Sequence, residues 1–183
     1  MFIFQLFGWF LFSCALISFI EHQFHCWFMH KKNFLSEHNA KYKRILEAHA
    51  GLHHGHYAKA FTDEPVPPGE DEEIRLTVRK APIKVLPIAL VIALFSWSGA
   101  LVFLGTAVFH HWVWNNIHLE MHKPEHRIFS EWPIYKWLAR YHCLHHLHPD
   151  KNFNVVFPFA DYILGTSVHA STADLQYLQA QGL

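Results

Sequence analysis

Histidines are the residues of this sequence whose number and spacing could do chemistry. The chain of 183 residues contains 18 of them, against 15 basic and 15 acidic residues. Ten fall in four clusters, with the sequences HCWFMH, HAGLHH, HLEMH and HCLHH. Neutral imidazole is a good ligand for iron, zinc, copper and nickel and suits magnesium and calcium poorly. The clusters therefore predict transition-metal ligands, namely His25, His30, His49, His53, His54, His118, His122, His142, His145 and His146.

The spacing within three clusters places imidazoles on one face of a helix. Residues three or four apart share a face, and such pairs are His49 with His53, His118 with His122, and His142 with His145 or His146. The adjacent doublets at 53–54 and 145–146 diverge by about 100° around a helix, so one doublet can serve two neighbouring metals. His25 and His30 are five apart, which predicts a local overwinding or a helix end.

The number of clustered imidazoles predicts two metals with about five ligands each. Burying ten unpaired imidazoles would cost desolvation free energy that coordination offsets. Metal-bound histidines also need hydrogen-bond acceptors for the second ring nitrogen. Candidate acceptors are Glu21, Glu120, Asp150, Asn152 and Asp161. His22, His56 and His148 flank the clusters as supporting groups or spare ligands, whereas His110 and His111 lie beside tryptophans and are interpreted as membrane-interface anchors.

The first twenty residues predict a membrane-spanning helix. Residues 1–20 are almost wholly apolar and carry no charge, and about twenty such residues cross a hydrocarbon core of roughly 30 Å. A cleaved signal peptide would begin with basic residues and end at a small-residue cleavage site, and neither is visible. We therefore expect a retained transmembrane helix.

A second apolar stretch, residues 85–113, predicts a membrane hairpin. It is too long for one comfortable span and short for two, and the sequence Ser-Trp-Ser-Gly at 96–99 interrupts its middle. We divide it into arms at about 83–97 and 99–114. Before it, residues 61–73 combine prolines, glycine and acids and predict a loop.

The distribution of charge sets the topology. Basic residues fall outside the apolar stretches, at Lys31, Lys32, Lys41, Lys43, Arg44, Arg79, Lys84, Lys123, Arg127, Lys136 and Arg140. With a hairpin they share one face of the membrane, which the positive-inside rule makes cytoplasmic. The membrane would be the bacterial inner membrane or the endoplasmic reticulum. The zero net charge gives no reason to expect nucleic-acid binding.

The expected fold is all-α and integral to the membrane. About three membrane-embedded helices and a cytoplasmic helical cap would form a single domain over residues 1–183. The pairs at 25 and 30 and at 118 and 122 each follow an apolar segment, so the helices that leave the bilayer carry ligands just above its surface. Cys14, Cys26 and Cys143 lack any Cys-x-x-Cys spacing and are interpreted as reduced thiols.

These clusters, in this order around a membrane hairpin, resemble those of the fatty acid hydroxylase/sterol desaturase superfamily. The segment EHQFHCWFMH resembles the first histidine box, HAGLHH and HCLHH the boxes that end in a doublet, and HLEMH the third box. The segment NFNVVFPFADYILGT is similar to the stretch after the last box. HAGLHH has three residues before its doublet where two are usual, which leaves open which of His49, His53, His54 and His56 bind metal.

The resemblance implies an oxygen-dependent lipid hydroxylase or desaturase. Its cofactor would be two iron ions held by histidines, with zinc able to occupy the site in a purified sample, and O₂ would be the co-substrate. The substrate would be a fatty-acyl, sphingoid or sterol-like lipid from the bilayer. No nucleotide-binding motif is present, so electrons would come from an external donor of the cytochrome b5 or ferredoxin type.

Three other functions compete with this interpretation. A carotenoid hydroxylase with the same kind of histidine boxes has a similar chain length. A membrane metal transporter or metal-binding protein would use the same ligands, but its path through the bilayer would need charged groups that the apolar segments lack. A haem-binding cytochrome would place histidines within the spans, where only His110 and His111 are candidates. The sequence does not set the oligomeric state.

Overall fold

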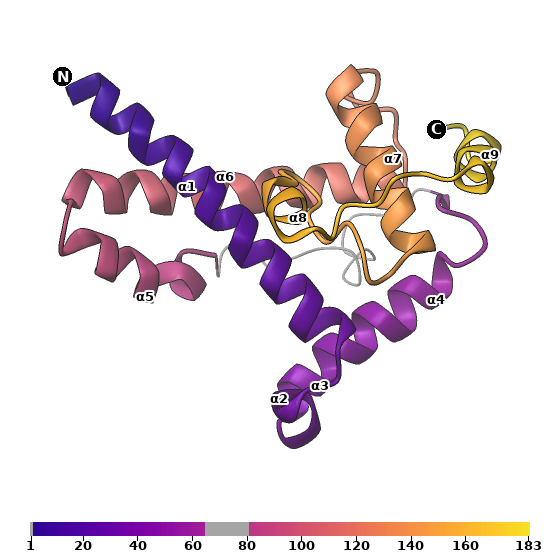
Figure 1. The fold of residues 1–183 in the computed structure, drawn as a ribbon, viewed down its shortest axis with the longest axis horizontal. Coiled ribbons are helices and arrows are strands. Elements are labelled where there is room, and N and C mark those ends of the chain that lie inside the picture. Colours follow the sequence, from indigo (N-terminus) through magenta and orange to yellow (C-terminus); the bar gives the residue numbers. More distant parts are fainter. Residues whose placement is uncertain (1, 65–80) are drawn as a thin grey trace.

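The computed structural model describes residues 2–64 and 81–183 (Figure 1). Within these ranges the regular elements are helices and no strand is present, as the sequence predicted. One end of the molecule consists of long apolar helices, and the other consists of shorter helices that pack around the histidines. Of the loop predicted at 61–73, residues 61–64 are irregular and the rest lies outside the described residues.

The first helix, α1 (Phe2–Phe24), continues directly into a π-helical turn, η1 (His25–His30). Together they form one rod of 29 residues with a mean hydropathy of 2.0 in its most apolar window, long and apolar enough to cross a membrane. Phe2, Ile3 and Phe4 are each more than 60% exposed, and no charge precedes Glu21. The predicted spanning segment is therefore a helix that leads straight into the first two candidate ligands.

The second apolar stretch forms a helical hairpin from α5 (Ala81–Ala93) and α6 (Trp97–His122). The first arm ends at Ala93 rather than Trp97, and the second begins at Trp97 rather than Gly99. Ser96 sets this boundary because its hydroxyl accepts the N–H of Gly99 at 3.0 Å and so caps α6. Within the described residues, only the rod of α1 and η1 is both long and apolar enough to cross a membrane; α5 is a shorter apolar helix.

The hairpin packs against α1 to form an apolar three-helix unit. Its buried residues come from all three helices and are Ile17, Val85, Ala89, Ile92, Ala100, Phe103 and Ala107. Gly99 lies against the ring of Trp9, where a Cβ would approach ring carbons to 2.5 Å. A glycine at this position therefore lets α6 approach α1 closely. The hairpin turn exposes Leu94 and Phe95, each more than 80% accessible.

The remaining helices form the cap. After a break at residues 31–33 come α2 (Phe34–His38), α3 (Ala40–Leu46), a second π-helix η2 (Glu47–His53) and α4 (His54–His56). The C-terminal part contributes α7 (Pro133–Leu147), α8 (Phe159–Leu164) and α9 (Thr172–Ala180). A second apolar core joins α6, α7 and α9 and includes Trp114, Met121, Leu138, Cys143 and Leu178. This core fixes α6 and α7 beside each other, and both helices carry candidate ligands.

Candidate metal centre

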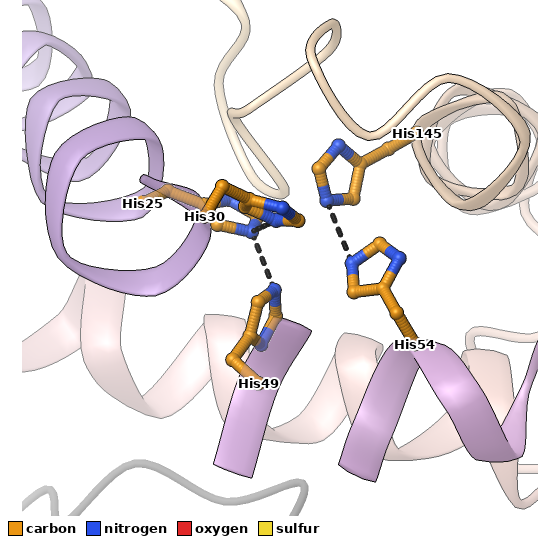
Figure 2. A group of neighbouring side chains, drawn as sticks. All are labelled: His25, His30, His49, His54 and His145. Carbon is orange, nitrogen blue, oxygen red and sulfur yellow. Dashed lines mark hydrogen bonds between the residues drawn. The ribbon is translucent and has the colours of Figure 1, made fainter. Parts of the chain in front are cut away.

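Five imidazoles from four elements converge on one point and form what we call the first histidine group. Its members are His25 and His30 of η1, His49 of η2, His54 of α4 and His145 of α7. Their facing ring nitrogens lie within 4.8 Å of one another, and Figure 2 shows the rings turned toward a common centre. The distance between Nε2 atoms is 2.8 Å for His25 and His49 and 3.1 Å for His54 and His145.

A second histidine group lies beside the first. Its members are His53 of η2, His118 and His122 of α6, and His142 of α7, with facing nitrogens again within 4.8 Å. The tenth predicted ligand, His146, adjoins this group because its Nε2 lies 3.3 Å from that of His142. Its ring also stacks on that of His54, with 4.2 Å between centroids. The fold therefore brings all ten predicted ligands together, while metal binding by each remains a prediction.

Two π-helical turns place histidines five residues apart on one face. Hydrogen bonds in a π-helix close over five residues instead of four, so positions i and i+5 align. This geometry in η1 aligns His25 with His30. Of the two predicted alternatives, local overwinding was wrong, because a π-helix is wound more loosely than an α-helix, whereas the helix does end at His30. In η2 the same geometry brings His49 to the first group with His54, and the looser winding accommodates the extra residue of HAGLHH.

The α-helices α6 and α7 supply ligands at ordinary helical spacing. One turn of α6 separates His118 from His122, and both belong to the second group. On α7, His145 belongs to the first group, and the neighbouring His146 contacts the second. The doublet at 53–54 divides in the same way. Each doublet therefore contributes to both groups, as the angle between adjacent helical positions predicted.

Backbone carbonyls orient three of these imidazoles through Nδ1. The three contacts are His25 to the carbonyl of Phe153 at 2.5 Å, His145 to that of Lys151 at 2.6 Å, and His122 to that of Phe61 at 2.9 Å. A carbonyl oxygen only accepts, so Nδ1 carries the proton in each ring. The lone pair is then on Nε2, the nitrogen directed into the group, as a metal ligand requires.

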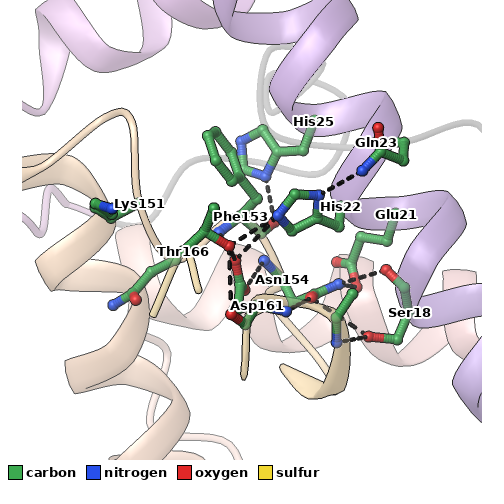
Figure 3. Close-up of polar contacts among 12 residues, drawn as sticks. Ser18, Glu21, His22, Gln23, His25, Lys151, Phe153, Asn154, Asp161 and Thr166 are labelled. Carbon is green, nitrogen blue, oxygen red and sulfur yellow. Dashed lines mark hydrogen bonds and ion pairs between the residues drawn. The ribbon is translucent and has the colours of Figure 1, made fainter. Parts of the chain in front are cut away.

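A buried carboxylate holds the loop that supplies two of these carbonyls. The loop, residues 151–155, follows α7, and Asp161 of α8 accepts its backbone N–H groups at Phe153 (3.0 Å) and Asn154 (2.8 Å). Figure 3 shows this network between α1 and the loop. Asp161 is fully buried. It therefore acts on His25 indirectly, by fixing the carbonyl of Phe153.

The side chains predicted to accept from the ligands serve other partners. For the three ligands whose Nδ1 contacts a carbonyl, the predicted acceptors Glu21, Glu120, Asp150, Asn152 and Asp161 were wrong. Glu21 accepts the N–H of Val155 at 3.0 Å, and Asn152 donates to the carbonyl of Tyr141 at 3.0 Å. The carboxylate of Glu120 pairs with Arg127 at 2.8 Å. These groups fix the backbone around the site, one layer farther out than predicted.

Burial keeps the grouped imidazoles neutral at physiological pH. Desolvation, reinforced by neighbouring imidazoles, lowers the pKa of His54 to about 3. The same causes hold the pKa far below its ordinary value for His49, His53, His122, His142, His145 and His146. Since a protonated imidazole cannot bind a metal, this burial favours the ligand form.

The geometry fits metal ions. Two nitrogens bonded at about 2.1 Å to one ion, at angles between an octahedral and a tetrahedral value, lie about 3.0–3.4 Å apart. The close Nε2 pairs span 2.8–3.3 Å. Both ring nitrogens of His53 are buried without a hydrogen-bond partner in the described part of the chain. Leaving a buried polar group unsatisfied costs about 1–3 kcal/mol, a cost that a bound metal would relieve at its ligand nitrogen.

Histidines outside the two groups have other contacts. The imidazole of His22 bonds the Thr166 hydroxyl at 2.8 Å and lies 3.5 Å from Asp161, in the layer behind the first group. The flanking histidines at 56 and 148 pair with Asp63 and Asp174 and belong to neither group. His110, interpreted as an interface anchor, lies 3.4 Å from Glu21 across the α1–α6 contact.

Aromatic side chains that the sequence interpretation missed enclose the second group. The ring of Tyr57 stacks on His122 with 4.1 Å between centroids, and that of Trp114 lies 4.2 Å from His118. Both aromatic residues are four positions from a candidate ligand, Tyr57 after His53 and Trp114 before His118, and this spacing could have identified them. These rings limit the access of water to the second group.

No protein-family model matches the chain, and no characterised protein or solved structure does either. The interpretation of the centre therefore rests on its own residues and geometry.

Proposed function

We propose that this protein is a membrane-bound di-iron oxygenase that hydroxylates, or desaturates, a C–H bond of a lipid. The observation that carries the proposal is the convergence of nine histidines in two adjoining groups, with His146 beside the second, at the end of an apolar helix. The groups share η2 and α7, each of which gives ligands to both. Two metals that share ligand-bearing helices can act on one substrate and one molecule of O₂.

Iron is the metal that the donor set and the proposed reaction favour together. All-imidazole sites suit iron, zinc, copper and nickel, and zinc can replace iron during purification. Bound iron would supply the activation of O₂ that attack on an unreactive C–H bond requires. The ligands would come from the two groups. His53 and His145 lie on the two elements, η2 and α7, that give histidines to both groups.

The chain's own residues would orient the ligands and exclude water. The carbonyls of Lys151 and Phe153 fix His145 and His25 in the tautomer that presents Nε2. Tyr57 and Trp114 cover rings of the second group. Exclusion of water would protect reactive species from side reactions while a substrate is present.

A lipid substrate follows from the membrane embedding that we propose for the apolar helices. The apolar rod of α1 and η1 carries His25 and His30 at its end, and α6 carries His118 and His122 beyond its apolar part. A lipid in the bilayer could therefore reach the histidines without crossing water. We place the centre on the cytoplasmic face, where an external donor of the cytochrome b5 or ferredoxin type would deliver electrons.

The test is a comparison of membrane lipids, carotenoids included, from cells that express wild-type protein or the His145→Ala/His146→Ala variant. We expect a lipid heavier by one oxygen, or lighter by two hydrogens, only with wild type. His169→Ala is the matched control, because this exposed histidine belongs to neither group. Iron content of the purified proteins should fall in the double variant and stay unchanged in the control.

If the wild-type protein contains iron and a reductant is present, identical lipid profiles in wild type and double variant would refute the proposed oxygenase function. A modified carotenoid would assign the enzyme to the carotenoid hydroxylases instead. Metal uptake into vesicles without any lipid product would favour a transporter.

A further inference from the structure

The segment of residues 157–164, which contains α8, packs against the apolar part of α1. The hydroxyl of Ser18 on α1 donates to the carbonyl of Phe157 at 2.6 Å and accepts the N–H of Ala160 at 2.9 Å. The rings of Phe19 and Phe159 meet edge to face, with 5.9 Å between centroids. Figure 1 likewise shows α8 beside the C-terminal half of α1.

This contact lies on the membrane side of the histidine groups. Glu21 and His110 meet at 3.4 Å and are the first ionisable side chains beyond the apolar parts of α1 and α6. At 1.5 Å per residue, Ser18 lies about 4.5 Å to the apolar side of Glu21, and His25 about 6 Å to the other side. Residues 157–164 therefore contact α1 on the apolar, N-terminal side of both Glu21 and the first ligand, His25.

The outward face of the segment is apolar. Its exposed residues are Phe157 (44%), Phe159 (37%), Tyr162 (58%), Ile163 (61%) and Leu164 (45%). The one charged residue between 157 and 164, Asp161, is fully buried and faces the network of Figure 3. On α7 the buried ring of Tyr141 contacts both Tyr162 (6.5 Å between centroids) and Trp137 (5.7 Å), and Trp137 is itself 40% exposed.

We propose that residues 157–164 lie in the boundary between headgroups and acyl chains, as a membrane contact additional to α1 and the hairpin. The partner is the lipid leaflet that surrounds the C-terminal half of α1, because the apolar face of the segment is continuous with that helix. Tyrosine and tryptophan favour this zone of a bilayer, and helices with one apolar face lie flat in it. This inference rests on the proposed membrane embedding of α1.

The contact has a consequence for the metal centre. Asp161 lies on the inner side of α8 and holds the backbone whose carbonyl orients His25. If α8 lies in the leaflet, this connection through Asp161 would also fix the depth of the first histidine group relative to the lipid. A lipid substrate would then meet the centre at a set depth.

Spin labels test this placement. Single cysteines at Ile163 and, independently, Tyr162 would be labelled in full-length protein that carries Cys14→Ser, in nanodiscs of phosphatidylcholine and phosphatidylglycerol. Power saturation would measure the accessibility of each label to O₂, which partitions into lipid, and to a water-soluble nickel chelate. Leu11→Cys on α1 is the lipid-facing control, and Leu175→Cys on α9 is the cap control; both residues are more than half exposed.

We expect labels at 162 and 163 to behave like the label at 11, with O₂ access well above nickel access, and the label at 175 to show the reverse. Nickel access at 162 and 163 equal to that at 175, with 11 still shielded, would overturn this inference alone. Nickel access at 11 as well would overturn the membrane embedding beneath it. Spin–spin broadening of the label at 163 would assign the surface to a contact with a second copy if dilution with unlabelled protein removed it. That result would also overturn the proposed lipid contact.

Discussion

The two histidine groups reach similar geometries from different helices. The first group takes two pairs from π-helical regions, His25 with His30 and His49 with His54, each five residues apart. The second takes His118 and His122 from α6 at a spacing of four, and the adjoining His146 lies four residues after its member His142 on α7. Each group also contains one histidine from an element that gives another histidine to the other group. These are His145 of α7 in the first group and His53 of η2 in the second.

This difference predicts unequal robustness. A π-helix is rare and occurs mostly as a short turn at functional sites, so the first group depends on features outside its own helices. One such feature is the loop held by Asp161, whose carbonyls orient His25 and His145. Three of the four members of the second group lie on α6 and α7, which the cap core already fixes. We therefore expect the first group to lose metal more easily than the second.

Removing a ligand pair should have the largest effect. His25→Ala/His30→Ala should empty the first group only, and His142→Ala/His146→Ala the second only, so each variant should bind one metal per chain instead of two. Product formation should fall more than about 100-fold in both, since loss of a mere outer partner already costs about 10–100-fold. Elemental analysis and product assays measure these outcomes, with His169→Ala as control. Loss of both metals from either variant would show that the groups are not separable.

Asp161→Asn should weaken the first group alone. The two backbone N–H groups bond different carboxylate oxygens, and the amide would replace one of these acceptors with an NH2 donor. The carbonyl of Phe153 should therefore shift and metal affinity fall about 10–100-fold. Titration with a competing chelator measures this. Glu120→Gln is the control, because Glu120 is equally buried but holds the turn after α6. Equal loss of metal from both groups would contradict an indirect action on His25.

Acid should destabilise the metal-free protein. The pKa of His54 is about 3 when folded and about 6.5 when unfolded. Between these values the unfolded state binds more protons, so stability falls as pH falls below about 6.5. At 1.36 kcal/mol per pH unit, this histidine alone would cost about 2 kcal/mol by pH 5. Thermal unfolding at pH 7 and pH 5 checks the sign, and His54→Gln should lose less stability than wild type. An unchanged melting temperature would mean that the imidazoles are solvated without metal.

Gly51→Ala should have the smallest effect. No heavy atom lies within 4 Å of the Cβ position at Gly51 of η2, and alanine in a helix is favoured over glycine by about 0.5–1 kcal/mol. For a chain of this size the melting temperature should rise by about 1–4 °C with both metals retained. Calorimetry and elemental analysis check this pair of outcomes. Loss of the first metal would instead show that the π-helical turn requires glycine.

The sequence alone was enough to predict an all-helical chain with clustered histidines. Imidazole was the most abundant donor, and two of its four clusters, at 25–30 and 118–122, followed the ends of apolar segments. Helical periodicity was enough to predict that the doublets would contribute to both groups, because adjacent positions diverge by a fixed angle. Helical periodicity was not enough to predict how His25 and His30 align, since a π-helix gives no local sequence signal that distinguishes it from an irregular helix end.

The division of the ten histidines into groups, and the contacts that hold them, follow from long-range packing. His54 meets His145 across 91 residues, and His25 meets the carbonyl of Phe153 across 128. Such contacts depend on the packing of distant elements, which periodicity does not report. Carbonyls were missed as acceptors because every residue has one, so their role depends on loop position and leaves no mark in residue type. The place of α8 beside Ser18 was decided in the same way.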